Sequence, residues 1–333
     1  MTKLGNSRDL RARLERTGLN SALIDAAWPT WWTEEAESSL SARAELRLSL
    51  SRKLGLDPRS LLEDDTPRFV WHDVGRFKHL LVDDENERDL LTAFGRSLGA
   101  IALAGAPSAV TIIGESAARL RAAATSSSSP FVRLLDLLAM CWSVGIPVLH
   151  VRVFPLVQKR MAAMTVRVGD RWAILLGKDS MYPAHIAFYL AHELGHVTQG
   201  HLGEAAVMVD FDFSGSEPID SEETAADTFA LELLTGSSKP EVLPHSDSYS
   251  ARELARLALA AGPEVGIEPG TLALCFGHAT GDWATANAAM PFIYEAPKPV
   301  WQEVNRVAMN QLDVDLMTPD GREYLATVIG ETA

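Results

Sequence analysis

The segment AHELGHVTQGH, residues 191–201, places a glutamate beside the first of two histidines that are four positions apart. Residues four apart lie on one face of an α-helix, so His192 and His196 can offer imidazole nitrogens to a single metal ion. The neighbouring Glu193 is expected beside the ion as a general base and not as a ligand. The alternative is a pair of structural histidines on the polar face of a buried helix.

A second helix is predicted over 221–235, and its first two turns carry three acidic residues. Glu223 and Asp227 are four positions apart and share a face of this helix. We expect Glu223 to be the third metal ligand and Asp227 to hydrogen-bond a ligand histidine, which fixes the histidine's tautomer. Glu222 is the alternative third ligand, but it has no acidic partner four residues further on.

Two histidines, one glutamate and one open position form the ligand arrangement of hydrolytic zinc sites, so Zn²⁺ is the expected cofactor. His201 lies nine residues after His192, one short of the spacing in HExxHxxGxxH sites, which disfavours a third histidine ligand. His201 can instead end the helix or donate a hydrogen bond to a transition state. Four more residues are candidate oxyanion donors, although a packing or surface role is favoured for each of them: Tyr182, His185, Tyr189 and His278.

The composition indicates an acidic, globular protein. The 333 residues carry a formal net charge of −14, which disfavours tight non-specific binding of nucleic acid by the whole molecule. Cys141 and Cys275 are far apart and suit reduced, buried thiols of a cytosolic protein. The N-terminus is polar, and no apolar run reaches the ~18 residues that span a bilayer. We therefore expect a cytoplasmic protein with no membrane contact.

The segment around the metal motif has the pattern of a small sheet with helices. PVLHVRVF (147–154) is typical of a strand, and MTVRV (164–168) and WAILL (172–176) flank GDR as in a hairpin. A loop rich in Asp, Ser and Gly is expected between the metal helix and the second helix. Helical patterns dominate on both sides of this segment, so the predicted fold class is α+β.

Four motifs resemble the ImmA/IrrE family of zinc metallopeptidases: SVGIPV (143–148), WAILL (172–176), AHELGHV (191–197) and EETAADTFALELL (222–234). The resemblance covers about residues 130–240. The family's second motif, Glu-x-x-Ala-(Asn/Asp)-x-Phe-Ala, places the third ligand on Glu223, followed by Asp227. Ala225 stands where an acidic residue is frequent, and LLTG replaces the usual LLMP, but neither change removes a ligand or the base.

The resemblance implies a zincin-like metallopeptidase core, made of a small sheet, the HExxH helix and the Glu-ligand helix, with mainly helical regions on both sides. The expected regions are a helix-turn-helix-like part (1–65), a helical connection (66–125), the metallopeptidase domain (126–240) and a helical C-terminal part (241–333). Family members typically cleave a helix-turn-helix repressor and so derepress stress, DNA-damage, phage-related or mobile-element genes. The expected function is therefore a zinc endopeptidase that acts on such a repressor.

The N-terminal part leaves two other functions open. RAELRLSLSRKLGLDPRSLLED (43–64) resembles the last helices of a repressor-type helix-turn-helix. The preceding WPTWWTEEAESS (28–39) is acidic where DNA-reading helices carry Arg, Asn or Gln, which favours protein contact over DNA binding. The alternatives are a DNA-binding regulator whose zinc domain acts as sensor or scaffold, and a toxin-like component of a toxin–antitoxin pair.

Overall fold

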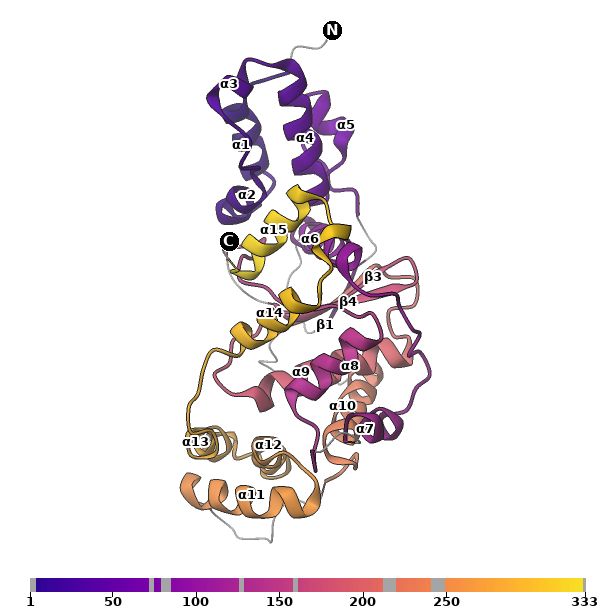
Figure 1. Cartoon of the computed structure of the whole chain (residues 1–333), viewed down its shortest axis with the longest axis vertical. Helices are drawn as coiled ribbons and strands as arrows, with labels where there is room; N and C mark the ends of the chain where they lie inside the picture. Colours follow the sequence, from indigo (N-terminus) through magenta and orange to yellow (C-terminus); the bar gives the residue numbers. More distant parts are fainter. Residues whose placement is uncertain are drawn as a thin grey trace.

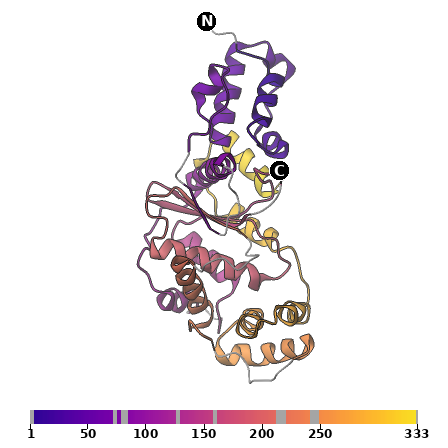
Figure 2. The ribbon, with the colours of Figure 1, turned by 180° about the vertical axis from the view of Figure 1, so that it is seen from behind.

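The computed structural model describes residues 4–71, 75–78, 85–125, 129–157, 161–211, 220–240 and 249–331. In these ranges a small mixed sheet of five strands lies between layers of helices (Figure 1). The view from behind shows the same layering (Figure 2). The α+β class predicted from the sequence is confirmed.

The sheet has the strand order β1-β5-β3-β4-β2. Its strands are β1 (Gly75–Lys78), β2 (Val148–His150), β3 (Met161–Val168), β4 (Arg171–Leu176) and β5 (Val207–Phe211). β3 and β4 pair antiparallel, which confirms the predicted hairpin. β5 runs antiparallel to β3, whereas β1 and β2 run parallel to β5 and β4.

Strand β5 lies in the segment where a loop was expected, so the prediction is wrong for these five residues. Val207, Met208 and Val209 are fully buried, and the burial of three consecutive apolar side chains favours a strand inside the sheet. The rest of the expected loop, residues 212–219, lies outside the described part of the chain.

Alternation along the strands directs side chains into two separate cores. Val207 and Val209 point to the core that contains Phe94 of α6 (Glu85–Gly105). Ala163 and Ile174 point to the opposite core, which is shared by α8 (Leu134–Ser143), α9 (Pro183–Gln199), α10 (Ser221–Thr235) and α14 (Val300–Gln311). Because β1 and α6 are part of these layers, the sheet and its covering extend beyond the segment 126–240.

Residues 4–65 form five helices: α1 (Ser7–Glu15), α2 (Ser21–Ala27), α3 (Glu34–Glu37), α4 (Leu40–Leu54) and α5 (Pro58–Leu62). The fully buried Arg47 of α4 donates to the backbone carbonyls of Leu61 and Gly5, at 3.0 and 2.9 Å. The buried Lys53 pairs with Asp320 at 2.5 Å. WPTWWTEEAESS contributes only the four-residue α3, which is shorter than a helix that reads a DNA groove.

The C-terminal residues form two groups of helices. α11 (Ala251–Val265), α12 (Pro269–Thr280) and α13 (Trp283–Ile293) pack on one another around their own core and lie at the lower end of the molecule in Figure 1. The 3₁₀ turn η1 (Val314–Leu316) packs against α6, and α15 (Pro319–Ile329) packs against α2, α4 and α6. The buried Asn305 of α14 donates to the carbonyls of His150 and Ile329, at 2.8 and 2.7 Å, and so ties α14 to β2 and α15.

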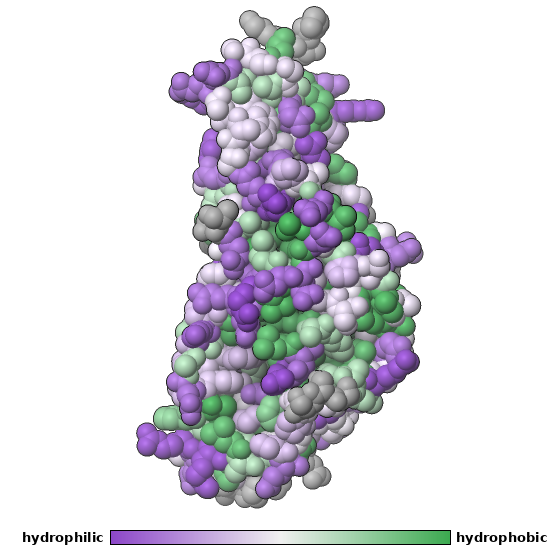
Figure 3. Space-filling model, viewed as in Figure 1, coloured by the Kyte–Doolittle hydropathy of each residue, from purple (hydrophilic) through white to green (hydrophobic). Residues whose placement is uncertain are grey.

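The remaining helix, α7 (Ala117–Thr125), packs against α10. On the face drawn in Figure 3, polar side chains are spread along the whole length of the molecule, with smaller apolar patches between them. No helix within the described ranges combines the length and the apolar character that crossing a bilayer requires.

Candidate metal centre

Helix α9 carries the two histidines of the HExxH motif on its buried side. Pro183 occupies its first turn, and Gly200 ends it in the left-handed conformation. The Nε2 atoms of His192 and His196 lie 3.0 Å apart, and the two residues are 8% and 0% exposed. The i, i+4 spacing therefore brings both Nε2 atoms to one point inside the protein.

Helix α10 brings Glu223 to the same point because it packs closely on α9. A Cβ added at Gly195 would lie 3.1 Å from the Cα of Ala226, so only a glycine fits at the helix crossing without displacement. Glu223 is 5% exposed, and its carboxylate oxygens lie 3.3 Å from Nε2 of His192 and 3.6 Å from Nε2 of His196.

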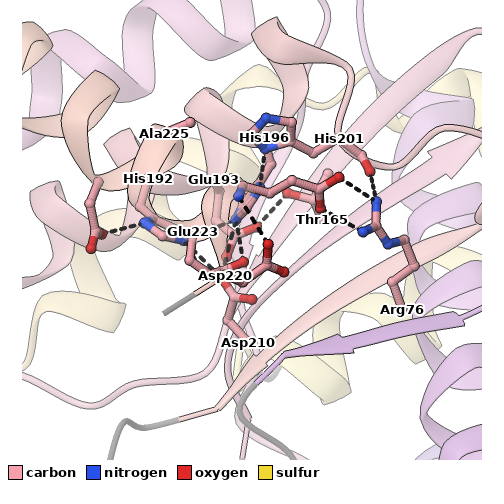
Figure 4. Close-up of polar contacts among 12 residues, drawn as sticks. Arg76, Thr165, His192, Glu193, His196, His201, Asp210, Asp220, Glu223 and Ala225 are labelled. Carbon is pink, nitrogen blue, oxygen red and sulfur yellow. Dashed lines mark hydrogen bonds and ion pairs between the residues drawn. The ribbon is translucent and has the colours of Figure 1, made fainter. Parts of the chain in front are cut away.

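Glu222 points in another direction and pairs with Arg76 of β1, at 2.5 Å between Nη2 and Oε2. Arg76 also donates to the backbone carbonyl of His201. The structure thus places Glu223, and not Glu222, beside the two histidines. Figure 4 shows Glu223 at the two histidines, with Arg76 on the side of β1.

Asp210 of β5 is a fourth member of the cluster, and the sequence analysis did not single it out. It is 6% exposed, and its Oδ2 lies 3.2 Å from Nε2 of His192 and 3.7 Å from Nε2 of His196. Because Val207 and Val209 face the other core, the alternation of the strand turns Asp210 toward α9. The continuous apolar run VMV in 207–209 is a local signal that could have identified the strand, whereas the position of Asp210 at its end depends on how the strand pairs.

The other ring nitrogen of each histidine is held by a partner outside the cluster. Asp227 lies with Oδ1 2.8 Å from Nδ1 of His192, which is the contact expected for it. His201 lies with Nδ1 2.9 Å from Nδ1 of His196. These contacts orient the rings so that both Nε2 atoms face the cluster. His201 is therefore a partner of a cluster histidine, and neither of the two roles considered for it describes this contact.

Glu193 is buried beside the cluster. It is 1% exposed, and the hydroxyl of Thr165 on β3 donates to its Oε2. Its Oε1 is buried without a hydrogen-bond donor among the described residues, and the carboxylate of Asp210 lies within hydrogen-bond reach of the Glu193 carboxyl. Burial first, and then the nearby carboxylate of Asp210, raise the pKa of Glu193 well above its usual value.

The other titratable groups of the cluster are shifted in opposite directions. Burial alone lowers the pKa of His192, but the hydrogen bonds that its ring donates to Asp210, Asp227 and Glu223 outweigh burial, and this pKa is raised well above its usual value. Burial lowers the pKa of His196 to about 4. Burial raises the pKa of Asp210, but the interactions with His192 and His196 outweigh burial and lower this pKa to about 2.

The donor set fits a metal ion. Four ligand atoms, one each from His192, His196, Asp210 and Glu223, lie within 4.8 Å of one another, and all four residues are buried. Two buried carboxylates within 4.8 Å of each other are costly without a cation. The cluster could therefore hold a metal ion, and imidazole and carboxylate groups suit several transition metals.

The other candidate donors have contacts elsewhere. Tyr182 stacks on Tyr294, with ring centroids 5.7 Å apart, and His278 lies edge-on to Trp283. His185 contacts Ser180 and Asn287 through its two nitrogens, at 3.0 Å each. Tyr189 lies edge-on to Phe188. These contacts agree with the packing roles favoured for them.

No family model, curated protein or solved structure matches the chain. The fold and site define an α+β protein with a buried cluster that can bind a metal ion.

Proposed function

We propose that this chain is a zinc-dependent endopeptidase with a zincin-like core, of the kind that the four ImmA/IrrE-like motifs imply. One observation carries the proposal: Glu193 lies buried beside a His192–His196–Glu223 cluster and is oriented by Thr165. A carboxylate next to the metal but outside the three-ligand set is the arrangement that hydrolytic zinc sites use for a general base.

Each residue then has a defined role. His192, His196 and Glu223 would hold the ion, which when bound would polarise the scissile carbonyl and lower the pKa of a water molecule. Glu193 would accept the water's proton on Oε1, the oxygen that Thr165 does not contact, and return it to the leaving amine. Asp227 and His201 would keep the imidazoles in the tautomer with Nε2 free for the ion.

The proposed substrate is a helix-turn-helix transcriptional repressor in the cytoplasm, as the motif resemblance implies. Cleavage would derepress the genes that the repressor controls. The N-terminal helices α1 to α5 then serve as a surface for protein contact, since the segment expected to read DNA contains only the short α3.

A second candidate is a regulator in which the metal is a scaffold. Asp210 favours it, because four protein ligands are typical of structural zinc sites, which have no open position. This candidate predicts that the function of the chain survives loss of the Glu193 carboxylate.

Terminal-peptide proteomics separates the two candidates. Host cells would express wild type, Glu193→Gln or Glu222→Gln, before and after DNA damage. The endopeptidase predicts a new cleavage in a helix-turn-helix regulator with wild type and with Glu222→Gln, and none with Glu193→Gln, while all three proteins retain zinc. Equal cleavage by wild type and Glu193→Gln would refute the role of the general base.

A further inference from the structure

The cluster contains one carboxylate more than the three-ligand set of a hydrolytic zinc site. Resting on the zinc centre proposed above, we propose that Asp210 is a fourth protein ligand, which closes the metal centre in this conformation. Activity then requires Asp210 to leave the metal. Strand β5, which is separate from the two helices that carry the other ligands, thereby has a regulatory role.

Five of the six distances between ligand groups are close to those of a four-ligand site. Ligand atoms about 2.1 Å from a tetrahedral zinc ion are about 3.4 Å from one another. The distances that connect the His192 and His196 Nε2 atoms to each other and to the Asp210 and Glu223 carboxylates lie between 3.0 and 3.7 Å, with Glu223 contributing Oε2 toward His192 and Oε1 toward His196. All four ligand atoms lie within 4.8 Å of one another. Oδ2 of Asp210 is as close to the two histidines as the oxygens of Glu223 are.

The charge of the set also favours a closed centre. Two neutral imidazoles and two carboxylates balance the charge of a divalent cation within the ligand set itself. The three-ligand set carries one negative charge and needs the neighbouring buried Glu193 to supply the second. Buried charges are least costly when their partner is in direct contact, so ligation by Asp210 stabilises the bound ion. A neutral centre with four protein ligands also has no position for water and is a poor hydrolytic catalyst.

The pairing of β5 with β3 orients the side chain of Asp210 toward the two histidines. In the sheet, Asp210 lies opposite Ala163, and the register shifts between Met161 and Ala163 in β3. This irregularity leaves one extra residue, Ala162, in β3 opposite the end of β5. Bulges of this kind bend a strand and redirect its side chains, and they are frequent next to active sites. Asp210 is the penultimate residue of β5 and pairs with Ala163 of β3 and with Lys78 of β1, where both ladders approach their ends.

Cobalt substitution tests the proposal by spectroscopy. Co²⁺ held by four ligands absorbs visible light strongly, and an anion that enters an open position changes the spectrum. In the wild type, azide is expected to leave the spectrum unchanged, whereas in Asp210→Ala azide should shift it. Glu222→Gln, which removes a nearby carboxylate that pairs with Arg76, should behave like the wild type. An equal azide response in wild type and Asp210→Ala would overturn the proposal.

Zinc affinity gives a second readout that does not depend on activity. Competition with a chelator should show that Asp210→Ala and Asp210→Asn each bind zinc at least about tenfold more weakly than the wild type, because even outer partners of metal ligands contribute that much. Circular dichroism confirms that both variants fold. Unchanged zinc affinity in both folded variants would also overturn the assignment of Asp210 as a ligand.

Activity separates this inference from the proposed function. With zinc saturating, Asp210→Ala should cleave the regulator found by proteomics faster than the unstimulated wild type, and the double variant with Glu193→Gln should not cleave it. If the spectra show Asp210 as a ligand but no variant cleaves any protein, the endopeptidase proposal fails and the four-ligand centre stands. If Asp210→Ala cleaves no faster than the resting wild type, the role of Asp210 in regulation is refuted.

Discussion

Gly195 of α9 lies against Ala226 of α10, at a point where an added Cβ would be only 3.1 Å from the Ala226 Cα. This contact sets the separation of the two helices between His192 and His196 on one side and Glu223 on the other. The glycine inside the HELGH sequence is thus a packing residue that determines whether Glu223 reaches the histidines.

Replacement of Gly195 by alanine should therefore weaken metal binding without removing a ligand. The new methyl group forces α10 outward by a few tenths of an ångström, and overpacking of this kind costs about 1–3 kcal/mol of folding free energy. Chelator competition and thermal denaturation measure the two effects. Ala225→Ser, on the adjacent and less buried position of α10, is the matched control and should change neither quantity. Wild-type zinc affinity in Gly195→Ala would show that the helices can separate freely.

The pair Glu222 and Glu223 allows a comparison of adjacent carboxylates on one helix. Glu223→Gln should lose more zinc affinity than the roughly 10–100-fold typical of changes in the outer partners of metal ligands, because it replaces a direct ligand. Glu222→Gln breaks a partly exposed pair with Arg76 and should change zinc affinity little. Isothermal titration with zinc measures both. Similar losses in the two variants would argue against Glu223 as the ligand from this helix.

Asp227→Asn should lower zinc affinity by about 10–100-fold while the ligand atoms stay in place, since Asp227 orients His192 through a 2.8 Å contact with Nδ1. Glu232→Gln, on the same helix and away from the cluster, serves as the control. An unchanged dissociation constant for Asp227→Asn would mean that packing alone holds the His192 ring.

The pH dependence of stability follows from the two groups with raised pKa. In the folded chain the pKa values of His192 and Glu193 lie above their ordinary values of 6.5 and 4.5. Both groups therefore keep their protons to higher pH in the folded chain than in the unfolded chain. Their contribution to stability is therefore present below those ordinary values and is lost as the pH rises through the raised ones. Zinc must displace the His192 proton, so zinc binds more tightly at higher pH.

The increase in melting temperature on zinc addition should consequently grow as the pH rises from about 5 to about 8. Differential scanning fluorimetry of metal-free and zinc-loaded protein across this range measures it. In Glu193→Gln the metal-free protein should lose less stability with rising pH, because one of the two groups is gone. A zinc effect that stays constant over the range would contradict the proton displacement.

The sequence was sufficient to place the residues on the two helices that carry the histidines and Glu223, because their spacing and end signals are local. His192 and His196 share a face by helical periodicity, and α10 begins after Asp220 and ends before Gly236, as its end signals predict. Glu223 lies at the cluster, as expected, while the metal it binds and the reaction it supports stay predictions.

Asp210 was not predictable by the same reasoning, because its place depends on strand pairing between distant segments. The bulge opposite it involves Ala162, and the strand beside it begins at Gly75. The contact between Thr165 and Glu193 likewise joins a strand and a helix with no common motif. Register between strands is set by the whole buried face of a sheet, which one local window of sequence does not describe.

Strand β1 has a practical consequence for any attempt to isolate the part of the chain that carries the motifs. It pairs with β5 along residues 75–78, and its Arg76 forms an ion pair with Glu222 and donates a hydrogen bond to the carbonyl of His201. A recombinant fragment limited to 126–240 would lack this strand and would present β5 as a bare edge, which is a template for intermolecular pairing and aggregation. The smallest fragment that can be expected to stay monomeric with an intact metal pocket must therefore include residues 75–105.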